Sequence, residues 1–144
     1  MIMCSMNLEN PPTLVHPWIP AHGHALRHTG VLFDAIRIPG ELGDQVAYEL
    51  IQFTDFKAGP IIRETAGARN MYFVLRAGTA ALHVWRGGAR ALGRDGRGVA
   101  FVGVPALDGN TWPLDWRSLP TWEAPFVEGE LLQQMVDRVL ATVR

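Results

Sequence analysis

Apolar residues recur at helical spacing in two stretches of the chain. In Glu41–Phe53 they fall on one side, and Glu41 and Asp44 stand near the start, where the positive end of a helix favours acids. In Val127–Val143 a longer stripe of Leu, Met and Val lies opposite Glu, Gln, Asp and Arg. Both stretches are predicted to be amphipathic helices. The stripe of the second is interpreted as core packing rather than as a dimer seam.

Shorter apolar runs that end at glycine or proline predict strands. Gly30–Ile38 is one such run and stops at Pro39. Pro60–Phe73 contains two β-rich runs, separated by a short turn of small residues, and this pattern is typical of a hairpin. Glu64 and Arg69 flank the turn, so the hairpin is polar where it meets water.

The second half of the chain is expected to form another hairpin. Val99–Val104 has the apolar composition of a buried strand, a turn follows at residues 108–110, and Leu114–Trp116 is interpreted as the return strand. Pro113 cannot donate a ladder hydrogen bond, which places this strand at the edge of a sheet. Residues after it are expected to be a loop in which Trp122 covers a sheet edge.

Two stretches between these elements are less regular. Thr79–Trp85 is compatible with a short helix capped by Thr79 or with a short strand, and the helix is favoured. Gly93–Gly98 contains three glycines, two arginines and an aspartate, which is typical of an exposed turn. Such loops can cradle phosphate, but a plain connector is favoured because no strand-to-helix context of the nucleotide-loop kind follows.

Residues 1–29 differ in composition from the rest of the chain. Four of the ten prolines lie in the first twenty residues, so we predict an extended arm that Trp18 and Ile19 attach to the body. Four of the five histidines lie between His16 and His28. A His-x-His pair on a strand directs both rings to one face and could bind a metal. A polar, partly exposed strand is favoured, because no acid or cysteine lies within the cluster.

The predicted order is strand, helix, hairpin, small helix, hairpin, helix. This order is typical of an α+β fold in which helices pack on one face of a mainly antiparallel sheet. We expect a single domain at residues 30–144, preceded by the arm, because a chain of 144 residues suits one hydrophobic core.

Composition narrows the function classes. The chain has 13 basic and 14 acidic side chains and a net charge of −1, without the basic excess that is usual in nonspecific nucleic-acid binders. Cys4 is the only cysteine, so no intrachain disulfide can form. Neither a signal peptide nor a membrane span is evident. A cytoplasmic protein with no membrane contact is therefore expected.

Several motifs resemble the N-terminal primase-polymerase domain of the archaeo-eukaryotic primase superfamily. The run Phe33–Gly43 is similar to one in small actinobacterial proteins that carry this family label, and the likeness extends over roughly Gly30–Trp116. It implies an RRM-like, primase-like half as the fold, and a link to nucleotides and DNA replication. The central hairpin motif of the family matches four residues here: Arg63, Gly67, Tyr72 and Phe73.

The residues that carry chemistry in this family are replaced. Its two metal-binding aspartates fall at Ile36 and Ile38, which offer no oxygen ligand for Mg²⁺. The histidine that contacts the triphosphate falls at Asn70, and the threonine of the motif is Glu64, which would repel a triphosphate. The third acid falls near Arg94, next to an aspartate, and one carboxylate does not make a two-metal site. We therefore expect no catalytic residue, no metal and no cofactor.

The resemblance and its departures together predict a catalytically inactive binding or regulatory module. A protein is the expected partner, with a nucleotide or a nucleic-acid strand as the alternative. The tryptophans of loops and edges, Trp85, Trp112 and Trp122, could be covered by that partner or could serve in packing. The candidate ligand-binding residues, each of which could equally be a solvated surface residue, are Arg37, Arg63, Arg69, Asn70 and Arg94.

Two other functions stay open at this point. An enzyme of unrelated chemistry would need Asp34, His83 or His28 to meet in one pocket, although Asp34 by itself is interpreted as an exposed residue on a strand. A module that binds single-stranded nucleic acid would use Tyr72 and Phe101 as stacking platforms on an open sheet, unless the core contains them.

Overall fold

The computed structural model describes residues 12–93 and 100–142 of the chain. Within these ranges the fold is α+β, with seven strands and two α-helices. The elements in chain order are β1 (His24–His28), β2 (Asp34–Ile38), α1 (Gly40–Phe53), β3 (Ile61–Glu64), β4 (Met71–Leu75), the 3-10 helix η2 (Ala80–Leu82), β5 (Arg90–Leu92), β6 (Phe101–Pro105), β7 (Leu114–Ser118) and α2 (Gly129–Thr142).

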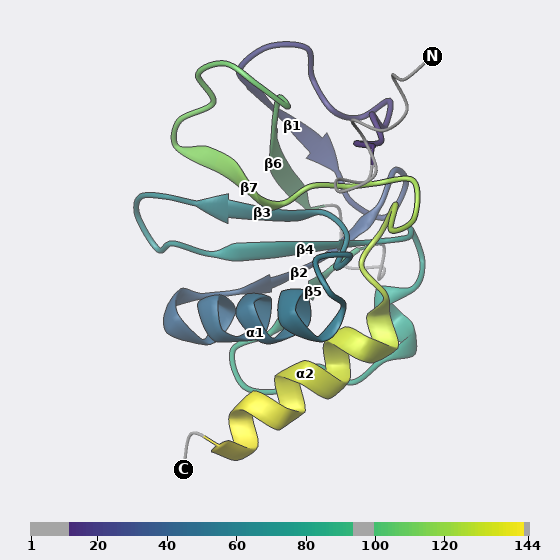
Figure 1. Ribbon diagram of the computed structural model, residues 1–144, viewed down its shortest axis with the longest axis vertical. Helices are drawn as coiled ribbons and strands as arrows, with labels where there is room; N and C mark the ends of the chain where they lie inside the picture. Colours follow the sequence, from purple (N-terminus) through teal and green to yellow (C-terminus); the bar gives the residue numbers. More distant parts are fainter. Residues whose placement is uncertain (1–11, 94–99, 143–144) are drawn as a thin grey trace, which may run out of the picture.

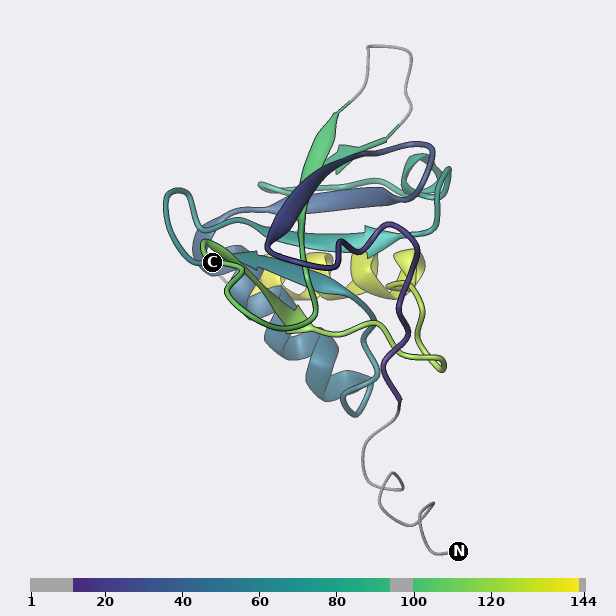
Figure 2. The same ribbon diagram turned by 90° about the horizontal axis from the view of Figure 1, so that it is seen from above.

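The strands form two antiparallel sheets. Five of them make the main sheet, in the order β5-β2-β4-β3-β7, while β1 and β6 pair with each other in a separate ribbon. Both α-helices lie on one face of the main sheet (Figure 1), and we call this the helix face. The ribbon lies across the opposite face (Figure 2), which we call the ribbon face. The prediction of helices on one face of an antiparallel sheet is confirmed.

Two cores follow from the pleat of the main sheet, because successive residues of a strand point to opposite faces. The core on the helix face includes Ile36, Ile38, Val46, Leu50, Phe73, Leu132 and Met135. The core on the ribbon face includes Trp18, Ala35, Ile62, Val74, Val102 and Val104. Both faces of the main sheet are thus apolar along most of their length. The sequences of its strands are therefore nearly continuous apolar runs.

The elements with the clearest patterns are where they were predicted. The helix α1 occupies the first periodic stretch, and β3 pairs with β4 as the expected hairpin. The helix α2 begins at Gly129 rather than Val127, because the carboxylate of Glu128 accepts a hydrogen bond from the Leu131 N–H at 2.9 Å and so caps the first turn. The strand after Pro113 is an edge strand, as predicted.

The predicted hairpin of β6 and β7 is wrong. The ladder of β6 is with β1, in the register His24 to Pro105, and the ladder of β7 is with β3. The two strands still touch through side chains: Leu114 Cδ1 lies so close to Gly103 that a Cβ atom there would come within 2.8 Å of it. Because β6 instead buries Val102 and Val104 on the ribbon face, it lies over the main sheet and does not extend it.

The stretch between β4 and β6 also differs from the prediction. Only the three residues of η2 are helical, and the Thr79 hydroxyl donates to the Arg76 carbonyl at 2.7 Å instead of capping that helix. The edge strand β5 was not predicted, because three residues are too few to show an alternating pattern. Most of the expected Gly93–Gly98 turn lies outside the described residues.

The segment before β1 is attached to the body as expected. Trp18 and Ile19 are buried, and Trp18 packs at 4.7 Å from Phe33, measured between ring centroids. The predicted polar strand is β1, whose residues alternate between exposed and partly buried. In the part of the chain that the structure describes, neither helix has the length and apolar character needed to cross a membrane.

Candidate functional site at the hairpin tip

The predicted ligand-binding residues do not share one face of the sheet. Arg37 is paired with Tyr72 and points to the ribbon face, whereas Arg63 is paired with Met71 and points to the helix face. Arg69 belongs to the turn between β3 and β4, where it is exposed and has a positive φ of 57°. Arg94 lies outside the described residues.

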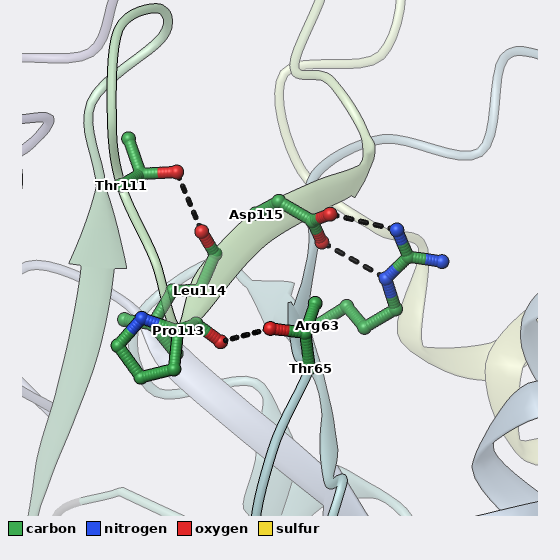
Figure 3. Close-up of polar contacts among 6 residues, drawn as sticks. All are labelled: Arg63, Thr65, Thr111, Pro113, Leu114 and Asp115. Carbon is green, nitrogen blue, oxygen red and sulfur yellow. Dashed lines mark hydrogen bonds and ion pairs between the residues drawn. The ribbon is translucent and has the colours of Figure 1, made fainter.

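Arg63 forms an ion pair that joins two strands, β3 and β7. Its Nε and Nη2 atoms donate to the two carboxylate oxygens of Asp115 on β7, at 2.9 and 2.7 Å (Figure 3). These hydrogen bonds and the charge of Asp115 raise the pKa of Arg63, although partial burial opposes the shift. Because this fork already binds a carboxylate within the chain, Arg63 is poorly placed to bind a ligand.

The loop before β7 is fixed to the β3–β4 turn by hydrogen bonds (Figure 3). The N–H and hydroxyl of Thr65 both donate to the carbonyl of Pro113, at 2.8 and 3.0 Å. The Thr111 hydroxyl donates to the carbonyl of Leu114 at 2.6 Å, and the Leu114 N–H donates back to Thr111. We call residues 65–70 and 111–113 together the hairpin tip. Its two loops come from parts of the chain that are 48 residues apart.

Trp112 is held on this loop with its side chain in solvent. The residue is 70% exposed, although its own N–H donates to the side chain of Asn110 and its neighbours are hydrogen bonded as described. Trp122 is 67% exposed, so it does not cover a sheet edge as predicted. Trp85 is partly buried and donates from Nε1 to the carbonyl of Ala80 at 2.9 Å, a packing role.

Glu64 closes the hairpin from the ribbon face. Its Oε1 accepts from the Asn70 N–H and its Oε2 accepts from the Tyr72 hydroxyl, both at 3.0 Å. Burial raises the pKa of Tyr72, and the hydrogen bond and charge of Glu64 add to this effect, while the charge of Arg37 opposes it. Glu64 therefore stabilises the turn.

The positions that the family resemblance implies as a metal site are part of the core. Ile36 and Ile38 are both 0% exposed and face the helices. Asn70 comes immediately before β4 and two residues before Tyr72, so it belongs to the register of the ribbon face. Ile36 and Ile38 therefore lie on the opposite face of the main sheet from Asn70, although these positions would have to meet around one ligand.

The interpretation of Asp34 as an exposed residue is wrong. It is 2% exposed, because it starts β2 on the same face as Ile36 and is covered by η2. Its Oδ2 accepts from the Ala80 N–H at 2.9 Å, and its Oδ1 is buried with no hydrogen-bond partner among the described residues. Gly93 passes so close that a Cβ atom there would lie 2.9 Å from Oδ1.

The histidines do not assemble into one site. His16 is buried: its ring stacks on Trp18 at 4.5 Å and its Nε2 lies 2.7 Å from the carbonyl oxygen of Pro125. His28 is on the ribbon, edge-on to Phe101, and His83 packs on the start of α2. Within residues 12–93 and 100–142, no three His, Cys, Asp or Glu side chains are grouped as a metal site.

A pocket of about 510 Å³ lies away from these residues, between the end of α1, η2 and the start of α2. At its rim Arg76 lies 4.9 Å from the centroid of the Phe126 ring, and Lys57 pairs with Glu123 at 3.4 Å. Its lining carries charges of both signs and includes none of the predicted ligand-binding residues. The pocket therefore favours neither an anion nor a cation.

Comparison with known proteins gives no match: no family model, no curated protein and no solved structure is similar to this chain. Geometry alone must therefore indicate a function. Sequence reasoning missed three residues: Thr65, Asp115 and Arg90. Thr65 and Asp115 are hydrogen bonded to Pro113 and Arg63, and Arg90 is the register partner of Arg37 on β2; each partner is distant in the sequence. No local motif marks any of the three, because each acquires its partner only through the register of the sheet.

Proposed function

We propose that this chain is a binding module of primase-polymerase-like ancestry, without two-metal phosphoryl-transfer chemistry, and that it docks a protein partner at the hairpin tip in the cytoplasm. One observation carries the proposal. The two positions where that chemistry would require carboxylates, Ile36 and Ile38, are fully buried in the core on the helix face. A divalent cation needs oxygen ligands that reach solvent or substrate, and this location offers neither.

A protein partner is favoured by the state of Trp112. A large aromatic side chain is a frequent anchor of protein interfaces, and it binds most tightly when its loop is already rigid. Trp112 is exposed, yet its loop is held by the hydrogen bonds from Thr65 and Thr111. Arg69 is exposed on the other half of the tip, and arginine is also enriched at the centres of interfaces.

Affinity capture from the native cell tests this function. Tagged wild type, Trp112→Ala and Trp122→Ala are compared by quantitative mass spectrometry. Trp122 is a matched control because it is equally exposed but lies on a different loop. We expect at least one protein to be lost with Trp112→Ala and retained with Trp122→Ala. Purified partner and wild type should then bind directly, with an affinity at least tenfold weaker for Trp112→Ala.

Two results would contradict the proposal. One is a set of captured proteins that is the same for all three forms, which would mean that the hairpin tip docks nothing. The other is extension of a primed template by the purified chain with Mn²⁺ and nucleotides, because a silent module cannot catalyse that reaction. The second assay needs no knowledge of the partner.

A further inference from the structure

Two arginines lie directly opposite each other on neighbouring strands of the main sheet. Arg37 of β2 and Arg90 of β5 are a register pair. Side chains of such a pair project from the same face, with Cβ atoms about 4.5–5.5 Å apart. The face is the ribbon face, since Arg37 also pairs with Tyr72 of β4, and Ala35 and Leu92, two residues further along, contribute to the core on that face.

Like charges at directly opposed positions destabilise a sheet unless an anion lies between or beside them. Among residues 12–93 and 100–142, the ion pairs are Arg63 with Asp115 and Lys57 with Glu123, and neither involves Arg37 or Arg90. The two guanidinium groups therefore have no carboxylate within ion-pair distance in the described chain.

Glu64 is on the same face of the sheet as Tyr72, and its carboxylate is already hydrogen bonded. Its two oxygens accept hydrogen bonds from Asn70 and Tyr72. Arg37 is the register partner of Tyr72 on β4, so the two side chains project from the same face of the main sheet. Of the described side chains named here, two arginines and one carboxylate together carry a net positive charge, and Tyr72 contributes no charge at neutral pH.

The location is open to a ligand. Arg90 is exposed, since β5 is a three-residue edge strand, and Arg37 and Tyr72 are half-buried. The adjacent row of Leu92, Ala35 and Val74 is covered by the ribbon, whereas the row of Arg90, Arg37 and Tyr72 lies next to it and is not fully buried.

We propose that Arg37 and Arg90 form a binding site for the phosphate group of a small phosphomonoester, with Tyr72 beside it. Each guanidinium presents a planar fork that matches two phosphate oxygens, and a dianion would offset both charges. The site is on the opposite face from Ile36 and Ile38, so it is separate from the metal positions implied by the primase-polymerase resemblance. It is also independent of protein docking at Trp112.

Titrations followed by two-dimensional amide NMR test the site. The probes are inorganic phosphate, AMP, adenosine and an oligothymidylate, and the proteins are wild type, Arg37→Gln, Arg90→Gln and Arg138→Gln. Arg138 is the matched control, an exposed arginine on α2. We expect saturable shifts around residues 37, 72 and 90 with phosphate and AMP, weakened about tenfold by Arg37→Gln or Arg90→Gln and unchanged by Arg138→Gln.

The four probes distinguish a site for a nucleotide from a site for phosphate alone. AMP that binds more tightly than phosphate would indicate a nucleotide, and equal affinities would indicate recognition of the phosphate alone; both outcomes support the site. Adenosine binding as tightly as AMP, or oligothymidylate binding that survives Arg37→Gln and Arg90→Gln, would overturn it. No saturable shift with millimolar phosphate or AMP would also overturn it.

Thermal unfolding provides a second measurement in case a variant is poorly folded. Phosphate should raise the Tm of wild type and of Trp112→Ala but not that of Arg90→Gln, because a ligand stabilises only the form that it binds. Arg37→Lys keeps the charge and removes the fork, so it should bind phosphate more weakly than wild type. A Tm that rises equally in all forms would mean a nonspecific salt effect and would refute the site.

Discussion

Aspartate at positions 36 and 38 should unfold this domain instead of creating a metal site. Ile36 and Ile38 are fully buried among α1, α2 and the main sheet. Replacing either isoleucine removes about 1.5–3 kcal/mol of apolar burial. The new carboxylate would have to lose its hydration without a cationic partner, which costs several kcal/mol more, or else stay protonated.

These magnitudes decide the outcome. A domain of this size has a free energy of unfolding of about 5–15 kcal/mol, so one substitution removes much of it and the pair removes all of it. Ile36→Val and Ile38→Val are the controls. They keep the apolar contact and should cost only about 0.5–1.5 kcal/mol each.

Urea unfolding followed by tryptophan fluorescence and near-UV circular dichroism gives the answer. We expect the valine variants to unfold cooperatively at a slightly lower urea midpoint, and the double aspartate variant to lack a cooperative transition. A double aspartate variant that unfolds cooperatively, binds Mn²⁺ and extends a primer would refute the assignment of these positions to the core, and with it the proposed silent module.

Three further expectations follow from contacts of single residues. A double-mutant cycle on Arg63→Gln and Asp115→Asn should give a coupling below about 1 kcal/mol, because the two side chains are 42% and 39% exposed; a coupling of several kcal/mol in urea unfolding would contradict this. Asp34→Ala should lower the free energy of unfolding by about 1–3 kcal/mol by leaving the buried Ala80 N–H unpaired, whereas Asp34→Asn, which keeps an acceptor, should cost less; equal costs would refute that role of the hydrogen bond. Burial lowers the pKa of His16, so the folded state binds fewer protons than the unfolded chain, and stability should decrease as the pH falls below 6.5 through the folded pKa; His16→Phe should remove this part of the pH dependence, and an unchanged profile would contradict it.

The sequence predicted those parts of the fold whose signal is local. The apolar periodicity of α1 and α2 and the glycine-containing turn between β3 and β4 are each contained in a short window of residues. The pairing of β1 with β6 has no such signal, because it joins residues 24–28 to residues 101–105. Alternation within Val99–Val104 fits a strand in either sheet, so its partner could not be deduced.

The candidate site was predicted less well, because successive side chains of a strand alternate between the two faces of the sheet. Arg37 and Arg63 were grouped by their closeness to one motif, yet the register of β2, β3 and β4 sends them to opposite faces. Arg90 was not considered, because its importance depends on a three-residue strand. Asp34 was expected in solvent, because the segments that cover it are the 3-10 helix η2, which is too short to predict, and Gly93.

The order in which the strands acquire their neighbours affects how the chain can mature during translation. The β3–β4 hairpin can close early, but β3 gains its second neighbour only when β7 has been made, and β1 waits for β6. The helix α2, which covers the apolar helix face of β2 and β4, is made after all seven described strands. During translation, both faces of the incomplete main sheet therefore expose apolar surface. Such a state binds chaperones and aggregates readily. Truncation before α2 should thus yield an aggregating fragment, not a smaller version of the domain.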